Sequence, residues 1–87
     1  MIQEDIKERI RGFILKNFVF DERRSLGDDE SLIGSGVIDS TGILELIAFL
    51  EEGWSITFAD DELTAENFDT LDRITAFVTK TLARKAA

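Results

Sequence analysis

Apolar side chains recur at helical spacing in three segments of this chain, with charged and polar residues between them. The spacing predicts amphipathic helices over residues 2–17, 40–52 and 71–85. Gly53 is expected to end the second helix, and Thr70 is expected to cap the third. The apolar positions are Ile2, Ile6, Ile10, Phe13 and Ile14 in the first helix, Ile43, Leu46, Ile47 and Leu50 in the second, and Leu71, Ile74, Phe77, Val78 and Leu82 in the third.

The segment between the first two helices, residues 18–38, has neither a helical nor a strand period. Its glycines, together with Ser and Asp nearby, predict turns, and a short helical turn fits residues 28–33. A loop of this length needs anchors in a compact domain. We expect the anchors to be its apolar side chains, Phe18, Phe20, Leu26, Leu32, Ile33, Val37 and Ile38.

A shorter stretch joins the second helix to the third long one. Trp54, Ile56 and Phe58 alternate with polar residues, as in a short strand. Because the chain offers no credible partner strand, we expect an extended connector that fills the core instead. Thr64 can then cap a short helix formed by AENF. The fold class predicted is all-α: a small four-helix bundle of three longer helices and one short helix, with a long loop between the first and second helices. Residues 1–87 would form a single domain.

Composition narrows the class of protein. With 87 residues, no apolar run long enough to span a bilayer and no secretory signal, we expect a cytoplasmic monomer that does not insert into membranes. The chain lacks Cys and His, so it has neither a thiolate nor an imidazole for catalysis or metal binding. We expect no catalytic residues and no metal site, and therefore not an enzyme.

Charge is distributed unevenly along the chain. The formal net charge is −8, and residues 25–72 carry thirteen acidic side chains without a Lys or Arg. Residues 73–87 carry four basic side chains and no acidic one. The long acidic stretch repels phosphate backbones, which argues against nucleic-acid binding, and it attracts proteins with basic patches. A solvated acidic surface that only keeps the protein in solution is the simpler alternative.

The segment GVIDSTGILEL, residues 36–46, places Asp39 and Ser40 where an apolar loop becomes the second helix. Either side chain could cap that helix. A helix N-terminus also presents unpaired N–H groups and partial positive charge, which favour an attached phosphate. A serine in the first turn would be exposed for modification. Because the chain has no thiol, thioester chemistry on it would need an imported one.

On these residues the chain resembles an acyl carrier protein, a member of the phosphopantetheine-dependent carrier family. The resemblance continues through IAFLEE and, at residues 66–74, ENFDTLDRI, which is similar to the family's junction between the third and fourth helices. It implies that a transferase moves 4′-phosphopantetheine from coenzyme A onto Ser40, and that the arm's thiol carries an acyl group as a thioester. It also implies that Asp39 helps to engage the transferase and its magnesium.

By the same resemblance, the second helix docks against basic patches of acyl-loading ligases or synthases. Thr41 stands where the family commonly has Leu, and Gly42 stands where fatty-acid carriers often have an acid. Gly42 could leave a bare patch for the arm or a partner. These departures favour a dedicated carrier loaded by its own adenylating ligase. The expected docking residues, of which Glu51 and Glu52 could instead only solubilise the helix, are Thr41, Gly42, Leu44, Glu45, Ala48, Glu51 and Glu52.

Three alternatives remain open from the sequence. An aminoacyl or peptidyl carrier would use the same attachment site for a different cargo. An unmodified acidic interaction module would bind a basic partner without any prosthetic group. A calcium-binding protein is disfavoured, because DDE at 28–30 and DDEL at 60–63 lack the spacing of a calcium-binding loop.

Overall fold

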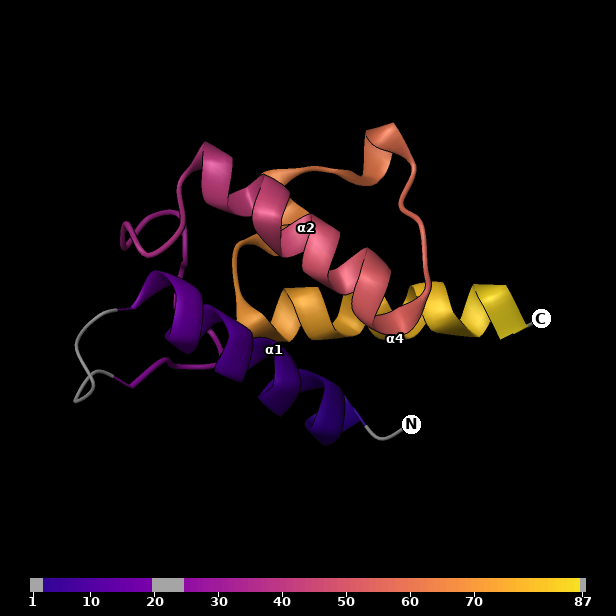
Figure 1. Ribbon diagram of the computed structural model, residues 1–87, viewed down its shortest axis with the longest axis horizontal. Coiled ribbons are helices and arrows are strands. Elements are labelled where there is room, and N and C mark those ends of the chain that lie inside the picture. Colours follow the sequence, from indigo (N-terminus) through magenta and orange to yellow (C-terminus); the bar gives the residue numbers. More distant parts are fainter. Residues whose placement is uncertain (1–2, 20–24, 87) are drawn as a thin grey trace.

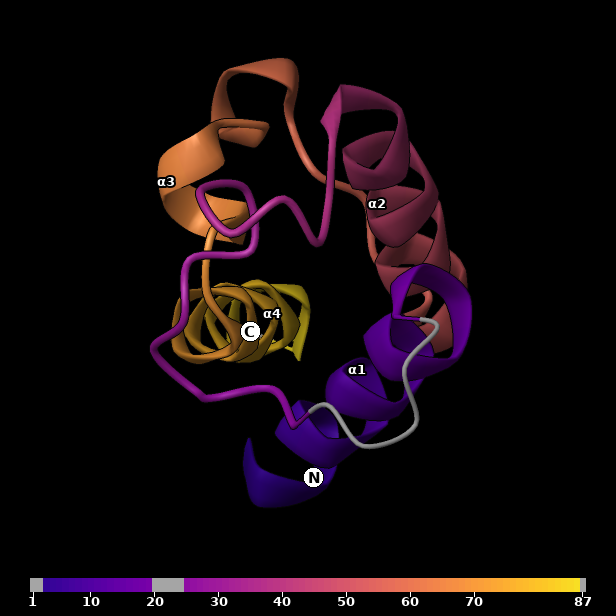
Figure 2. The same ribbon diagram turned by 90° about the vertical axis from the view of Figure 1, so that its left-hand side faces the viewer.

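The computed structural model describes residues 3–19 and 25–86. In chain order the elements are α1 (Gln3–Phe18), α2 (Ser40–Trp54), the 3-10 helix η1 (Asp60–Glu62), α3 (Ala65–Phe68) and α4 (Leu71–Ala86). Figure 1 shows the three long helices, and Figure 2 shows α2 and the short α3 on opposite sides above α4. The predicted all-α fold, with one short helix and a long loop between α1 and α2, is confirmed.

The core forms where the predicted apolar faces meet. α4 makes its most extensive contacts with α1 and, next, with α3. Ile6, Ile10 and Ile14 of α1 are fully buried one helical turn apart, as are Ile74 and Val78 of α4. Each such side chain contributes roughly 1.5–3 kcal/mol on burial, so these faces fix how the helices pack.

The connector after α2 fills the core as expected. Trp54, Ile56 and Phe58 are buried, while the residues between them are exposed. The ring of Phe58 stacks on Phe77 of α4 at 5.0 Å and meets Phe68 of α3 edge-on at 5.8 Å. These aromatic contacts hold the connector and α3 against α4.

The expectation that Gly53 ends α2 is wrong. The helix continues to Trp54, whose ring is buried, and stops where Ser55 adopts a left-handed conformation with φ of 54°. The carbonyl of Glu51 accepts hydrogen bonds from the N–H groups of both Ser55 and Ile56. The two additional residues therefore place Trp54 in the core, and the left-handed end satisfies the Glu51 carbonyl.

The helical turn expected at residues 28–33 lies further along the loop. Within the described residues it falls at 31–35, where the Ser35 N–H bonds the Ser31 carbonyl at 3.0 Å, and the chain then turns again at Gly36. Of the expected anchors, Ile33 is 39% exposed and does not act as one. Phe20 lies outside the described residues. Phe18, also expected as an anchor of the loop, is the last residue of α1 instead. The confirmed anchors are Leu26, Leu32 and Ile38, which are buried, and Val37, which is partly buried.

Charged side chains tie the same loop to the bundle. Asp28 accepts hydrogen bonds from Arg11 and from Lys7, the latter at 3.3 Å, and Lys7 also bonds Asp72 at 2.7 Å. The pKa of the Asp28 carboxyl is lowered, first by the hydrogen bond from Arg11 and then by that from Lys7. These ties join α1, the loop and the start of α4. Of the helices that the structure describes, none is long and apolar enough to cross a bilayer.

Candidate functional site

Asp39 caps α2, and Ser40 opens it. Asp39 has an extended backbone, with φ of −102° and ψ of −174°, and its Oδ1 accepts a hydrogen bond from the Gly42 N–H at 2.7 Å. Its carbonyl accepts the first helical bond, from Ile43 N–H at 2.9 Å. Of the two candidate caps, Asp39 is therefore the one used. Ser40 is the first helical residue, and its side chain is exposed.

The first turn of α2 has the donor set that a phosphate group requires. Among the described residues, the N–H groups of Ser40 and Thr41 make no hydrogen bond, since Asp39 engages only those of Gly42 and Ile43. Free N–H groups at a helix N-terminus and the partial positive charge there favour an anion. The residues present thus fit a phosphate-linked group on the Ser40 hydroxyl.

Gly42 does not form the bare outer patch that the sequence analysis expects. It is buried, and a Cβ added to it would lie 3.0 Å from Cε1 of Phe18 and 3.1 Å from Cγ2 of Ile38. The missing side chain makes room for Phe18, at the end of α1, to pack on the first turn of α2. The interpretation of Gly42 as an exposed approach point is therefore wrong.

A hollow of about 430 Å³ lies beside the first turn of α2. The end of α1 forms one wall through Asn17 and Phe18, which the sequence analysis did not include in the site. Phe18 lies four residues after Ile14, so the apolar stripe of α1 could have indicated it. Two carboxylates and no Lys or Arg line this hollow, whose lining is Asn17, Phe18, Gly36, Val37, Asp39, Thr41, Gly42 and Glu45.

Five of the seven expected docking residues share an exposed face of α2. Leu44, 66% exposed, is the most exposed large apolar side chain among the described residues, and it lies next to the acids of that helix. Ile43 and Ile47 turn towards the core instead. We call this surface the α2 face; it consists of Thr41, Leu44, Glu45, Ala48 and Glu52.

Glu51, unlike Glu52, is engaged inside the molecule. Its Oε2 accepts a hydrogen bond from the Phe58 N–H at 3.0 Å, and its side chain is only partly exposed. Because its carbonyl also binds the start of the connector, Glu51 fastens residues 55–58 to α2. Together with Gly42, it is an expected docking residue that the structure does not place on the α2 face.

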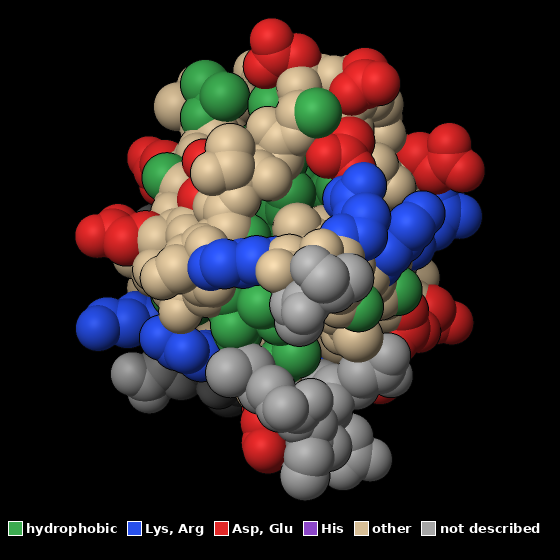
Figure 3. All heavy atoms as spheres, turned by 90° about the vertical axis from the view of Figure 1, so that its right-hand side faces the viewer, with side chains coloured by type: hydrophobic (Ala, Val, Ile, Leu, Met, Phe, Trp, Pro, Cys, Tyr) green, Lys and Arg blue, Asp and Glu red, His purple; other side chains and the backbone are tan. Residues whose placement is uncertain are grey.

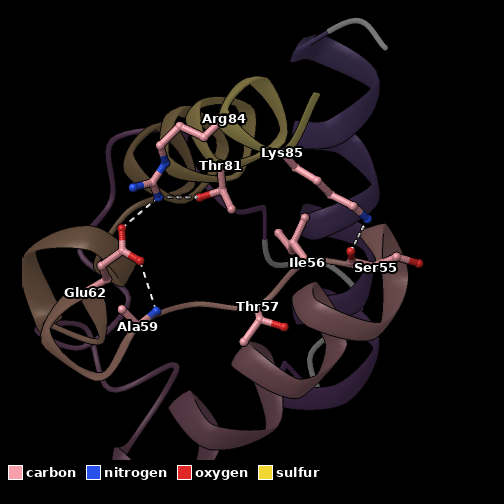
Figure 4. Close-up of a pocket in the computed structure, with 8 residues that line it drawn as sticks. All are labelled: Ser55, Ile56, Thr57, Ala59, Glu62, Thr81, Arg84 and Lys85. Atoms are coloured by element: carbon pink, nitrogen blue, oxygen red, sulfur yellow. Dashed lines mark hydrogen bonds and ion pairs between the residues drawn. The ribbon is translucent and has the colours of Figure 1, made fainter. Parts of the chain in front are cut away.

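Basic side chains gather at the opposite end of the molecule, around the C-terminal end of α4 (Figure 3). A second hollow there lies between the connector and α4 (Figure 4). Its cations are engaged: Arg84 pairs with Glu62 at 2.8 Å, and Lys85 bonds the Ser55 carbonyl. The Ala59 N–H and then Arg84 lower the pKa of the Glu62 carboxyl.

This second hollow is far from the first turn of α2. Its lining begins at Ser55, at the other end of a helix that is about 22 Å long for its fifteen residues. It therefore belongs to a separate region of the surface. Among the described residues, no group of three or more Asp and Glu side chains is arranged to hold a metal ion.

The arrangement as a whole defines a class of protein. A small acidic helical bundle presents one exposed serine at a capped helix N-terminus, beside a face that combines Leu44 with Glu45 and Glu52. This is the layout of a phosphopantetheine-dependent carrier protein, the class that the sequence predicts.

Comparison with known proteins narrows that class. A D-alanyl carrier protein of Streptococcus suis is 37% identical over 70 residues, which cover 80% of this chain and 86% of the relative. A D-alanyl carrier protein of Streptococcus mutans is 33% identical over 76 residues, covering 87% and 94%. A scan against models of protein families finds no match. The chain belongs to the D-alanyl carrier protein family and is a carrier rather than an enzyme.

Proposed function

We propose that this chain carries D-alanine as a thioester on a 4′-phosphopantetheine arm attached to Ser40. The observation that carries the proposal is the exposed Ser40 at the capped start of α2, in a chain whose relatives are D-alanyl carrier proteins. When bound, the arm supplies the thiol that the 87 residues lack.

The chain's own residues prepare the attachment point. Ser40 presents its hydroxyl to solvent, where an incoming transferase can remove the proton. The Ser40 oxygen then bonds the phosphorus that carries the pantetheine of coenzyme A, the pyrophosphate bond breaks, and 3′,5′-ADP leaves. Asp39 keeps the first turn of α2 helical through its bond to Gly42. The free N–H groups of Ser40 and Thr41 then face the developing phosphodiester with favourable charge. Asp39 also lies next to Ser40, as expected for a residue that helps to engage the transferase and its magnesium.

Partner enzymes would be recognised by the α2 face. Leu44 supplies an exposed apolar contact, and Glu45 and Glu52 supply negative charge for Lys and Arg of a transferase and of a D-alanine-activating ligase. The net negative charge of the chain would attract both enzymes, and Glu45 and Glu52 would orient them on the α2 face.

The cargo follows the relatives rather than a fatty acid. The sequence alone puts an acyl carrier first and an aminoacyl carrier second, but the D-alanyl carrier relatives support the second. Thr41 and Gly42 already favour a dedicated carrier with its own adenylating ligase. Such a ligase would join the carboxylate of D-alanine to the AMP part of ATP and release pyrophosphate. A thiol would then displace AMP to form the thioester.

Modification can be tested by intact mass spectrometry. The purified protein is incubated with coenzyme A, magnesium and a broad-specificity phosphopantetheinyl transferase. We expect the wild type and Ser35→Ala, which removes an exposed serine of the loop, to gain the mass of one arm, and Ser40→Ala to gain none. A wild type that stays unmodified, or a modified Ser40→Ala variant, would contradict the proposal and favour an unmodified acidic interaction module.

A further inference from the structure

Asp69, at the junction of α3 and α4, binds the long loop with both its side chain and its backbone. Oδ1 and Oδ2 lie 2.8 and 3.0 Å from the Ser31 hydroxyl, and Oδ1 also accepts from the Ile33 N–H at 3.1 Å. The Asp69 carbonyl accepts from the Leu32 N–H at 2.6 Å. Asp69, which is partly buried, thus contacts the three consecutive residues Ser31, Leu32 and Ile33. Ser31 lies 38 positions before it in the sequence.

The hydrogen bonds continue from this anchor to the start of α2. The Ser31 hydroxyl accepts from the Gly34 N–H at 2.9 Å, which closes the turn after it. The Leu32 carbonyl accepts from the Ile38 N–H at 3.1 Å, which brings the end of the loop back to its anchored part. Ile38 is buried and directly precedes the cap residue Asp39. The path therefore has two contacts at Asp69, its side chain on Ser31 and Ile33 and its carbonyl on Leu32 between them, and it continues through Ile38 to the first turn of α2.

The packing of Leu32 and Ile38 shows that this path fixes the position of the loop against the first turn of α2. Leu32 and Ile38 are fully buried on either side of the turn, so the loop cannot move without exposing them. Ile38 also lies against the site of Gly42, where even one added carbon would come within 3.1 Å. A shift of the loop would consequently displace the first turn that presents Ser40.

We propose that Asp69 is a positioning residue for the modification of Ser40: it holds residues 31–38, and through them the N-terminus of α2, where a transferase meets the hydroxyl. This inference rests on the proposed function. Positioning errors of about 1 Å can cost on the order of 100-fold in rate, because the reacting atoms no longer align.

The kinetic test compares Asp69→Asn with Asp61→Asn, which removes the same charge from an exposed position of η1. Asn keeps the Asp69 carbonyl that binds Leu32 and one side-chain oxygen, but an NH₂ group replaces the second oxygen, so Ser31 and Ile33 must share one uncharged acceptor. Apo protein is the substrate of a phosphopantetheinyl transferase, at a temperature where circular dichroism shows both variants folded. For Asp69→Asn we expect kcat to fall at least about tenfold with KM within about twofold, since the α2 face that docks is unchanged. Asp61→Asn should keep both constants.

Ser31→Ala provides a milder second variant. It removes the hydroxyl that binds Asp69 and Gly34 but leaves the contact of Asp69 with Ile33, so we expect a smaller fall in kcat. Because both substitutions disrupt the contact between Ser31 and Asp69, the double variant should lose less than the product of the two single fold-losses. If folded Asp69→Asn and Ser31→Ala both keep the wild-type kcat, or if Asp61→Asn loses as much, the positioning role is refuted.

Amide hydrogen exchange tests the same path without any transferase. In Asp69→Asn, exchange should quicken at Ile33 and at Gly42, which lies at the far end of the path, but not at buried positions of α1 such as Ile10. Unchanged exchange at Gly42 would overturn the inference by itself. If the proposed function is wrong, the result is different: the wild type gains no mass with coenzyme A and the transferase, while Asp69→Asn still quickens amide exchange at Ile33 and Gly42.

Discussion

Among single residues, Gly42 has a different role in the structure from the one that the sequence suggests. The sequence places a glycine two residues after Ser40, where it weakens a helix and offers open space. In the structure that space is occupied by Phe18 and Ile38, which approach the glycine so closely that a methyl group would crowd both. The residue therefore lets α1 and the loop pack directly on the first turn of α2.

Gly42→Ala should destabilise the protein although alanine is the better helix former. Overpacking costs typically ~1–3 kcal/mol, while the gain in helix propensity is about 1 kcal/mol, so we expect a net loss of roughly 1 kcal/mol. The matched control is Gly12→Ala, because a Cβ at Gly12 of α1 meets nothing within 4 Å. That variant should gain about 0.5–1 kcal/mol. Urea unfolding measures both, and a stabilised Gly42→Ala would refute the packing.

Thr75 carries a buried hydroxyl without a hydrogen-bond partner among the described residues, at 3% exposure. Thr75→Val keeps the shape and removes the unsatisfied group, so we expect it to raise the free energy of unfolding by about 1 kcal/mol. Thr81→Val is the contrast, since the Thr81 hydroxyl donates to the Phe77 carbonyl and accepts from Arg84. Thr81→Val should not raise the free energy of unfolding. Equal effects of the two substitutions in chemical unfolding would contradict the conclusion that the Thr75 hydroxyl is unsatisfied.

At the scale of elements, the long loop is held by two aspartates in different ways. Asp28 makes charged contacts to α1, and Asp69 accepts hydrogen bonds from the turn at 31–35. The contacts of Asp28 depend on pH in the acidic range, because Arg11 and Lys7 lower the pKa of the Asp28 carboxyl below its ordinary 3.8.

A lowered native pKa means that the stabilisation by Asp28 is complete above pH 3.8 and is lost as pH falls through the native value. The free energy of unfolding of the wild type should therefore decline on acidification below pH 4. In Asp28→Asn the decline should be shallower, because one contributing carboxylate is gone. Asp29→Asn, at the exposed next position, should retain the wild-type slope. Urea unfolding at several pH values distinguishes the two, and parallel curves for all three proteins would exclude the Asp28 contribution.

At the scale of the whole molecule, periodicity predicted the three long helices because each buries one continuous apolar face. The start of α2 at Asp39 and Ser40 and the exposed part of that helix could also be predicted, since they depend on residues adjacent in sequence. Contacts between distant residues could not: Ser31 with Asp69, Phe18 with Gly42, and Glu51 with Phe58 follow no period. The end of α2 was misplaced because burial of Trp54 outweighs the local tendency of Gly53 to stop a helix.

The molecule has an exposed serine at the N-terminus of α2, an α2 face that runs along that helix from Thr41 to Glu52, and engaged cations beyond its C-terminal end. The central proposal is that Ser40, through its phosphopantetheine arm, carries D-alanine. The most direct measurement is to isolate the protein from its own cells, release the thioester-bound group with hydroxylamine, and identify it by chiral chromatography and mass spectrometry. We expect D-alanine from the wild type and nothing from Ser40→Ala. A fatty acyl group, an L-amino acid, or D-alanine released from Ser40→Ala would contradict it.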